Sequence, residues 1–212
     1  MISIRTCWAF GVAAAAATLA GFFLAHQLDR ASPQLASGTW LPQPKALPQF
    51  TLIDTGGHAF TRRELDSAPA LVFFGYAHCP DACPTTLLKL AQVRKRAAAS
   101  AKPRVLFVSV DPQRDTPAVL AAYVHAFDPS FEALTGSPQA IEQLAAAFGV
   151  AFNRVELPGG DYTMEHSVAV FLVDDAARIA ATFTPPFDVA AFAADLDRAA
   201  PYLKSGSARP AT

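Results

Sequence analysis

Residues 70–96 read ALVFFGYAHCPDACPTTLLKLAQVRKR, a continuous apolar run followed by a cysteine pair and an amphipathic stretch. An unbroken run such as ALVFFGY is typical of a strand buried on both faces of a sheet. From Pro84 to Ala99, apolar residues recur at helical spacing and basic residues occupy the opposite face, which predicts a helix. Cys79 and Cys83 therefore lie between a buried strand and the helix that follows it.

The rest of the chain continues this alternation of strands and helices. Two more buried strands are predicted at 104–110 and 167–173, a small hairpin at 50–53 with the segment around Ala59, and a strand at 177–183 that pairs with 167–173. Helices are predicted from Thr116-Pro117 to about Phe127, from Ser137-Pro138 to about Gly149, and over 188–200. This order predicts a thioredoxin-like α/β fold, with a central mixed sheet flanked by helices.

Composition limits the class of protein. The chain has 212 residues, is 52% hydrophobic and carries a formal net charge of -1. This charge gives no electrostatic case for nucleic acid or for anionic membrane surfaces. Only three cysteines occur, and one of them, Cys7, lies in the apolar leader, so a framework of several disulfides is excluded.

The N-terminus predicts a membrane anchor. After Arg5 the chain is almost continuously apolar from Trp8 to Ala25. A stretch of about 18 residues is just long enough to span a bilayer and exceeds the apolar region of most cleaved signal peptides, the alternative here. Arg5 on the short side predicts that the domain after His26 is exported across the inner (cytoplasmic) membrane to its periplasmic side. Cys7 precedes the apolar run, which argues against a lipoprotein site.

Four segments are expected. Residues 1–30 form the single-pass anchor and residues 31–48, which are rich in proline, form an extended tether. Residues 49–203 form the folded domain, and residues 204–212 form a flexible tail.

The cysteine pair has three interpretations: a structural disulfide, a redox dithiol, or two thiolate ligands for a metal. The start of a helix favours thiolate over thiol, whether the N-cap is Cys83 or Asp81. A disulfide here closes a very short loop and stabilises little. Two thiolates suit a soft metal such as Cu(I) or zinc, but they do not complete a tetrahedral zinc site, so a third ligand is needed.

Five histidines are candidates for that ligand. His26 borders the anchor, His58 lies in a hairpin turn and His125 lies in a helix, which are ordinary places for a histidine. His78 adjoins Cys79 and is expected to point away from a metal that Cys79 binds. His166 lies just before a buried strand, in a segment that is expected to be a loop.

Four motifs together resemble the Sco/SenC family of copper-binding, thioredoxin-like proteins. They are FGYAHCPDACPTTL, VSVDPQRDTP at 108–117, LTG at 134–136 and EHS before VFLVD. The resemblance implies that Cys79, Cys83 and His166 bind one copper per chain, as Cu(I) or Cu(II). The family commonly has aspartate before this histidine, where the present chain has Glu165.

The resemblance also implies a function. The chain is expected to be a membrane-anchored copper chaperone for the copper A centre of cytochrome c oxidase subunit II, or for another copper-accepting protein. The alternative is a thiol-disulfide oxidoreductase that reduces the client's cysteines, or a role in redox signalling. Whether the chain is an enzyme therefore stays open, and a peroxidase is the weaker interpretation. His166 distinguishes the two main hypotheses, because a reductase needs only Cys79 and Cys83.

The DPQRDTP segment, 111–117, ends a strand at the same edge as the cysteines. Helix capping by Asp115 or Thr116 is the favoured interpretation of its second half. A docking patch that includes Arg114 and Asp115 is the alternative, and the roles of Asp111 and Arg114 stay open.

Overall fold

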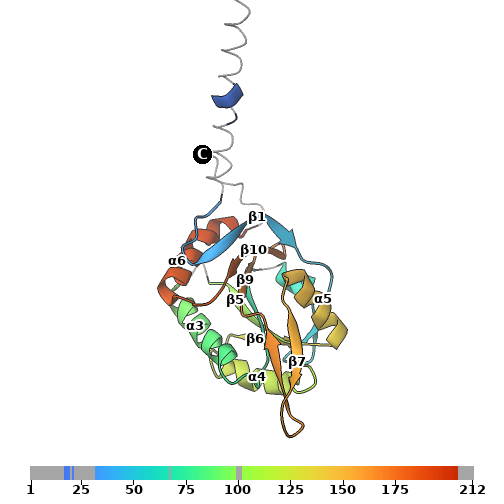
Figure 1. The fold of residues 1–212 in the computed structure, drawn as a ribbon. Coiled ribbons are helices and arrows are strands. Elements are labelled where there is room, and N and C mark those ends of the chain that lie inside the picture. The colour runs from blue at the N-terminus through green and yellow to red at the C-terminus, as the bar shows by residue number, and fades with distance from the viewer. Residues whose placement is uncertain (1–16, 20, 22–31, 67, 99–101, 205–212) are drawn as a thin grey trace, which may run out of the picture. The chain divides into compact units, whose positions relative to one another are not determined.

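The computed structural model describes residues 17–19, 21, 32–66, 68–98 and 102–204. The chain divides into two compact units. One comprises Met1–Pro33 with Ala208–Thr212, and the other comprises Gln34–Ser207. The elements described below all belong to the second unit (Figure 1).

An eight-stranded mixed sheet forms the centre of this unit, in the order β1-β10-β9-β4-β5-β6-β2-β3. Its strands are β1 (Gly38–Ala46), β2 (Thr51–Asp54), β3 (Ala59–Thr61), β4 (Ala70–Gly75), β5 (Arg104–Ser109), β6 (Glu132–Thr135), β9 (Val170–Val173) and β10 (Arg178–Phe183). β4 pairs in parallel with β5 and antiparallel with β9. All six residues of β4 are buried, so the buried central strand predicted from ALVFFGY is confirmed.

Helices cover the sheet; the four longest correspond to predicted helices, whereas the short ones at 62–65 and 200–202 were not predicted. They are α2 (Arg62–Leu65), α3 (Ala82–Arg96), α4 (Pro117–His125), α5 (Pro138–Phe148) and α6 (Val189–Ala199), with a short 3₁₀ helix, η2 (Ala200–Tyr202). α3 packs beside α6, and Figure 1 shows α5 on the other side of the sheet. The predicted caps of α4 and α5 are confirmed, because Thr116 and Ser137 each accept a hydrogen bond from a first-turn amide. Gly149 ends α5 at φ 72°, which favours glycine.

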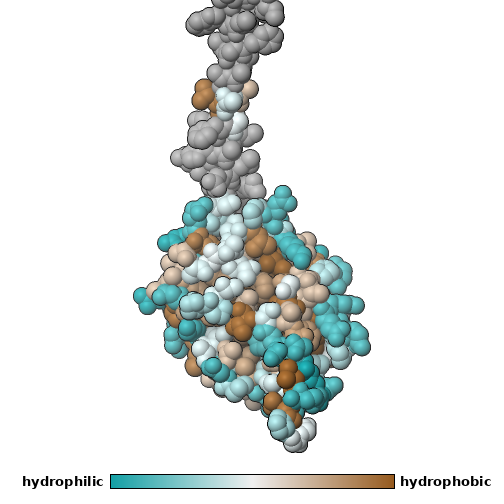
Figure 2. All heavy atoms as spheres, in the orientation of Figure 1, coloured by the Kyte–Doolittle hydropathy of each residue, from teal (hydrophilic) through white to brown (hydrophobic). Residues whose placement is uncertain are grey.

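The surface of this unit mixes residue types. Figure 2 shows hydrophilic and hydrophobic residues interspersed over the visible face. The largest side chains that are fully buried are phenylalanines and leucines, among them Phe73, Phe74 and Phe107. These rings lie on β4 and β5, so the core is centred on the strands that lead to the cysteine pair.

The proline-rich segment is not a free tether throughout. Gly38–Ala46 forms β1, which pairs antiparallel with β10, so the expectation of a tether up to residue 48 is wrong for these residues. β1 is an edge strand and its register shifts between Trp40 and Lys45, where prolines are tolerated. Asp195 of α6 fixes the start of β1, because its carboxylate accepts hydrogen bonds from the amides of Ala36, Ser37 and Gly38.

The expected membrane anchor lies largely outside the described residues. Of residues 1–30, only 17–19 and 21 are described, and these are helical. Across the described part of the chain, no helix has both the length and the apolar character needed to cross a membrane. The expected tail is described only at Lys204. The anchor and the tail therefore stay predictions.

Candidate metal centre

The cysteines occupy the connection between β4 and α3 and the first turn of that helix. The N-cap of α3 is Asp81 and not Cys83, so Pro84 lies in the first turn of this helix. First-turn N–H groups have no carbonyl partner within a helix, so the missing N–H of proline costs no hydrogen bond there. The Cys79 amide donates to the Tyr76 carbonyl at 3.3 Å, which turns the chain before the helix. Cys83 is fully buried and Cys79 is half-buried, and both are free.

His166 comes from a different part of the chain. A hairpin of β7 (Phe152–Glu156) and β8 (Tyr162–His166) forms a separate two-stranded sheet, and His166 is the last residue of β8. The expectation of a loop at His166 is therefore wrong. Gly159 and Gly160 close this hairpin with φ values of 92° and 84°, a conformation that favours glycine.

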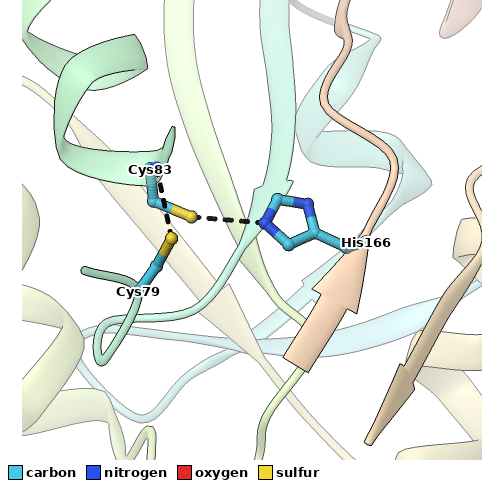
Figure 3. Close-up of side chains that lie close together, drawn as sticks. All are labelled: Cys79, Cys83 and His166. Atoms are coloured by element: carbon cyan, nitrogen blue, oxygen red, sulfur yellow. Dashed lines mark hydrogen bonds between the residues drawn. The ribbon is translucent and has the colours of Figure 1, made fainter. Parts of the chain in front are cut away.

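The histidine points at the cysteines. Figure 3 shows its ring directed from the end of β8 toward Cys79 and Cys83. Nε2 of His166 lies 3.4 Å from Sγ of Cys83. On the other side of the ring, Nδ1 lies 3.1 Å from the Ser167 carbonyl oxygen. A carbonyl only accepts hydrogen bonds, so Nδ1 carries a proton, and in the neutral ring Nε2 is then the nitrogen that can bind a metal.

The three side chains fit a single metal ion. One ligand atom from each of Cys79, Cys83 and His166 lies within 4.8 Å of the other two, and no other such group of three occurs among the described residues. Two atoms bound to one metal at about 2.0–2.3 Å are at most about 4.6 Å apart. Small side-chain movements therefore suffice to close the site around an ion.

The two cysteines differ in acidity. The pKa of Cys79 is lowered to about 4, first because the Cys83 side chain donates a hydrogen bond to it. The Cys83 amide also donates to Cys79 Sγ, at 3.4 Å. The same hydrogen bond between the side chains and the burial of Cys83 raise the pKa of Cys83. Without metal, the negative charge of the pair therefore resides on Cys79, the sulfur nearer to solvent.

Gly75 provides the space for the buried cysteine. It is the last residue of β4, and a Cβ atom there would lie 2.7 Å from Sγ of Cys83 and 2.8 Å from the Phe107 ring. Carbon and sulfur atoms do not approach this closely without repulsion. A glycine at this position is therefore required for Cys83 to turn inward toward His166.

The buried carboxylate of Asp115 anchors the loop between β4 and α3 by a hydrogen bond. Its side chain is fully buried and accepts hydrogen bonds from the Ala77 amide at 3.0 Å and from Ser109 Oγ at 2.6 Å. Burial raises its pKa, although these two hydrogen bonds act in the opposite direction. Capping by Asp115, one of the two favoured interpretations, is wrong, because Thr116 caps α4. A buried Asp115 also cannot form part of an exposed docking patch.

Among the described residues, the other histidines are not part of the site. His58 pairs with Asp54 in the β2–β3 turn, His125 is exposed at the end of α4, and His26 lies outside the described residues. His78 is half-exposed and lies 3.5 Å from Asp115. Glu165 is exposed and accepts a hydrogen bond from the Asn153 side chain, away from the cysteines.

The fold and this site define a thioredoxin-like α/β domain in which two cysteines and a histidine form a candidate metal centre. Comparison with known proteins agrees. The sequence profile of the SCO1/SenC family matches residues 41–201. The chain belongs to the SCO1/SenC family.

Individual relatives are moderately similar in sequence. The mitochondrial SCO2 homolog of Bos taurus is 35% identical over 163 residues, covering 74% of this chain and 61% of the relative. A putative copper-binding protein of Stutzerimonas stutzeri is 33% identical over 135 residues, covering 63% of this chain and 66% of the relative. The chain therefore spans about two thirds or less of the length of these curated relatives.

Solved structures of relatives also resemble the present one, and two of them follow. Bradyrhizobium japonicum ScoI, solved with copper bound, is 38% identical with a TM-score of 0.66, covering 72% of this chain and 98% of that one. Arabidopsis thaliana ScoI, also solved with copper bound, is 30% identical with a TM-score of 0.68, covering 71% of this chain and 95% of that one.

Proposed function

We propose that this chain is a copper chaperone that carries one copper ion on Cys79, Cys83 and His166. The observation that carries the proposal is the convergence of these three ligand atoms within 4.8 Å of one another. Relatives solved with copper bound support copper as the cargo.

The donor set suits both oxidation states of copper. Two thiolates form a soft pair that holds Cu(I), and the imidazole adds the nitrogen donor that Cu(II) prefers. Three protein ligands leave one face of the ion open. A client thiolate enters at this face, and Cys79, which is half-buried, is then displaced more easily than the buried Cys83. Copper thus passes by ligand exchange without being released.

The client and the location complete the proposal. By family resemblance, the client is the copper A centre of cytochrome c oxidase subunit II or a similar copper-accepting site. The apolar leader anchors the chain to the inner membrane, with the domain of Gln34–Ser207 on the periplasmic side. Oxidation of the Cys79 thiolate and the Cys83 thiol to a disulfide removes two electrons and one proton and leaves no thiolate for the metal, so copper loading requires the reduced form.

Copper titration of the reduced full chain in detergent tests this proposal. We expect one copper per chain, with Cu(II) binding lost in His166→Ala and Cu(I) binding retained. His125→Ala is the matched control, because His125 is exposed at the end of α4, away from the cysteines. Unchanged Cu(II) binding in His166→Ala contradicts the assignment of His166.

A thiol-disulfide reductase is the second candidate function. The observation that favours it is the lowered pKa of Cys79, about 4, beside a buried thiol. The Cys79 thiolate attacks a client disulfide and forms a mixed disulfide. Cys83 then loses its proton and attacks Cys79, which releases the client dithiol and leaves the chain oxidised until an external dithiol reduces it. Reduction of a client disulfide that survives His166→Ala but not Cys79→Ser favours this function.

A further inference from the structure

The hairpin that carries His166 does not pair with the main sheet. β7 and β8 pair with each other and form their own two-stranded sheet, apart from the eight strands that include β4. Pairing within the hairpin therefore does not fix the distance between His166 and the cysteines. The short connection 167–169 ties His166 to β9, whose Val170 pairs with Phe73 of β4, and side-chain contacts between the hairpin and the loops after β4 and β5 add to this restraint.

Tyr76 makes the first of these contacts. It is 2% exposed, and its hydroxyl lies 2.7 Å from Oγ1 of Thr163 on β8. Its ring stands edge-on to the His166 ring at 6.0 Å between centroids, with an interplanar angle of 90°. Its carbonyl accepts the amide hydrogen of Cys79. One residue therefore contacts both the cysteine loop and the hairpin.

Tyr162, at the start of β8, makes the second contact. Its hydroxyl donates to Oδ1 of Asp111 at 2.8 Å, and its carbonyl accepts from Nη1 of Arg114 at 2.9 Å. Asp111 is 3% exposed and forms an ion pair with Arg114. The Tyr162 ring also lies 3.6 Å from the guanidinium groups of Arg114 and Arg154. Asp111 and Arg114 therefore have a structural role, which could not be assigned from the sequence.

We propose that Tyr76 and the Asp111–Arg114–Tyr162 cluster are positioning residues that hold His166 against the cysteine pair, an inference that rests on the proposed copper site. Loss of either hydroxyl contact lets the hairpin, and with it the imidazole, move away while Cys79 and Cys83 stay in place.

Three tyrosine-to-phenylalanine variants of the full chain test this inference. Tyr76→Phe and Tyr162→Phe each remove one hydroxyl and keep the ring. Tyr123→Phe is the matched control, because the buried Tyr123 hydroxyl has no hydrogen-bond partner in the described part of the chain. Cu(II) and Cu(I) affinities are measured for each variant by competition with chelators. Hydrogen exchange of the β8 amides is measured on the metal-free protein.

The expected effects differ between the two oxidation states. Tyr76→Phe removes a hydrogen bond between neutral groups and is expected to lower Cu(II) affinity by about three- to tenfold. Tyr162→Phe removes a hydrogen bond to the Asp111 carboxylate and is expected to lower Cu(II) affinity by about tenfold or more. Cu(I) affinity changes by less than about twofold, because the cysteines hold Cu(I). The β8 amides exchange faster in Tyr76→Phe and Tyr162→Phe than in Tyr123→Phe.

The outcomes separate this inference from the copper site itself. If Cu(II) affinity and β8 exchange in both variants match Tyr123→Phe, the positioning role is wrong while the copper site stands. If Cu(I) and Cu(II) affinities fall equally, the tyrosines support the whole domain and not His166, which also overturns the inference. If the unmodified chain binds no copper, the proposed function fails, and faster β8 exchange in the two variants still supports the attachment of the hairpin.

Discussion

Replacing Gly75 by alanine is the most informative change next to the metal centre. The added Cβ atom would lie 2.7 Å from Sγ of Cys83 and 2.8 Å from Cε2 of Phe107. Carbon atoms attract one another at about 3.5–4.0 Å, so each contact is too short by about 1 Å. Cys83 and Phe107 are both 0% exposed, so neither side chain can move out into solvent without disturbing its neighbours. The cysteine pair or the core must therefore shift.

The magnitude follows from two opposing effects. Overpacking a core costs about 1–3 kcal/mol, whereas replacing glycine by alanine in a strand gains about 0.5–1 kcal/mol. We expect a net loss of about 1–2 kcal/mol in the free energy of unfolding. Cys83 Sγ lies 3.4 Å from His166 Nε2, and its displacement also weakens copper binding. A loss of about 1.4 kcal/mol in binding free energy lowers copper affinity about tenfold.

Urea unfolding and copper competition measure these two effects. Gly136→Ala is the control, because its Cβ would meet Cδ2 of Leu52 at 2.9 Å, the end of a side chain remote from the cysteines. We expect both variants to lose stability and only Gly75→Ala to lose copper affinity. Equal copper affinity in the two variants refutes the argument that Gly75 makes room for Cys83.

Two further predictions concern the pH dependence of the protein. Burial alone would raise the pKa of Asp195, but hydrogen bonds from Ala36 and Ser37 outweigh it and lower the pKa. The stability that Asp195 contributes is thus present above the unfolded pKa of about 3.9 and is lost as pH falls through the lower folded value. We expect Asp195→Ala to cost about 3 kcal/mol at pH 7 in urea unfolding and clearly less near pH 3; an equal cost at both contradicts this. Because the pKa of Cys79 is about 4, alkylation of the metal-free protein by iodoacetamide is expected to be nearly independent of pH between about 6 and 9, and a rate that rises through this range as for a free thiol contradicts the prediction.

Much of the fold follows from local sequence patterns. ALVFFGY predicts β4 because a strand buried on both faces is apolar throughout, and Thr116 and Ser137 predict two helix starts because capping depends on neighbouring amides. β1 could not be predicted this way. Its prolines indicate an extended tether, and its place in the sheet depends on the remote edge of β10 and on Asp195.

The metal site could also be predicted only where it depends on a local sequence pattern. The position of Cys79 and Cys83 before a helix follows from the local pattern, whereas His166 was assigned through family resemblance. The hairpin that carries His166 was missed because no residue of β7 or β8 is fully buried and neither strand has an apolar run. The burial of Asp115 was missed because its partners, Ala77 and Ser109, belong to other elements of the chain.

X-ray absorption spectroscopy at the copper edge is the sharpest test of the proposed copper site, because it reports the atoms bound to the metal. For the reduced chain loaded with one copper, we expect two sulfur neighbours and one imidazole nitrogen. The nitrogen signal should disappear in His166→Ala while both sulfurs persist. An imidazole nitrogen that remains in His166→Ala, or a single sulfur in the unmodified chain, would contradict a copper site built from Cys79, Cys83 and His166.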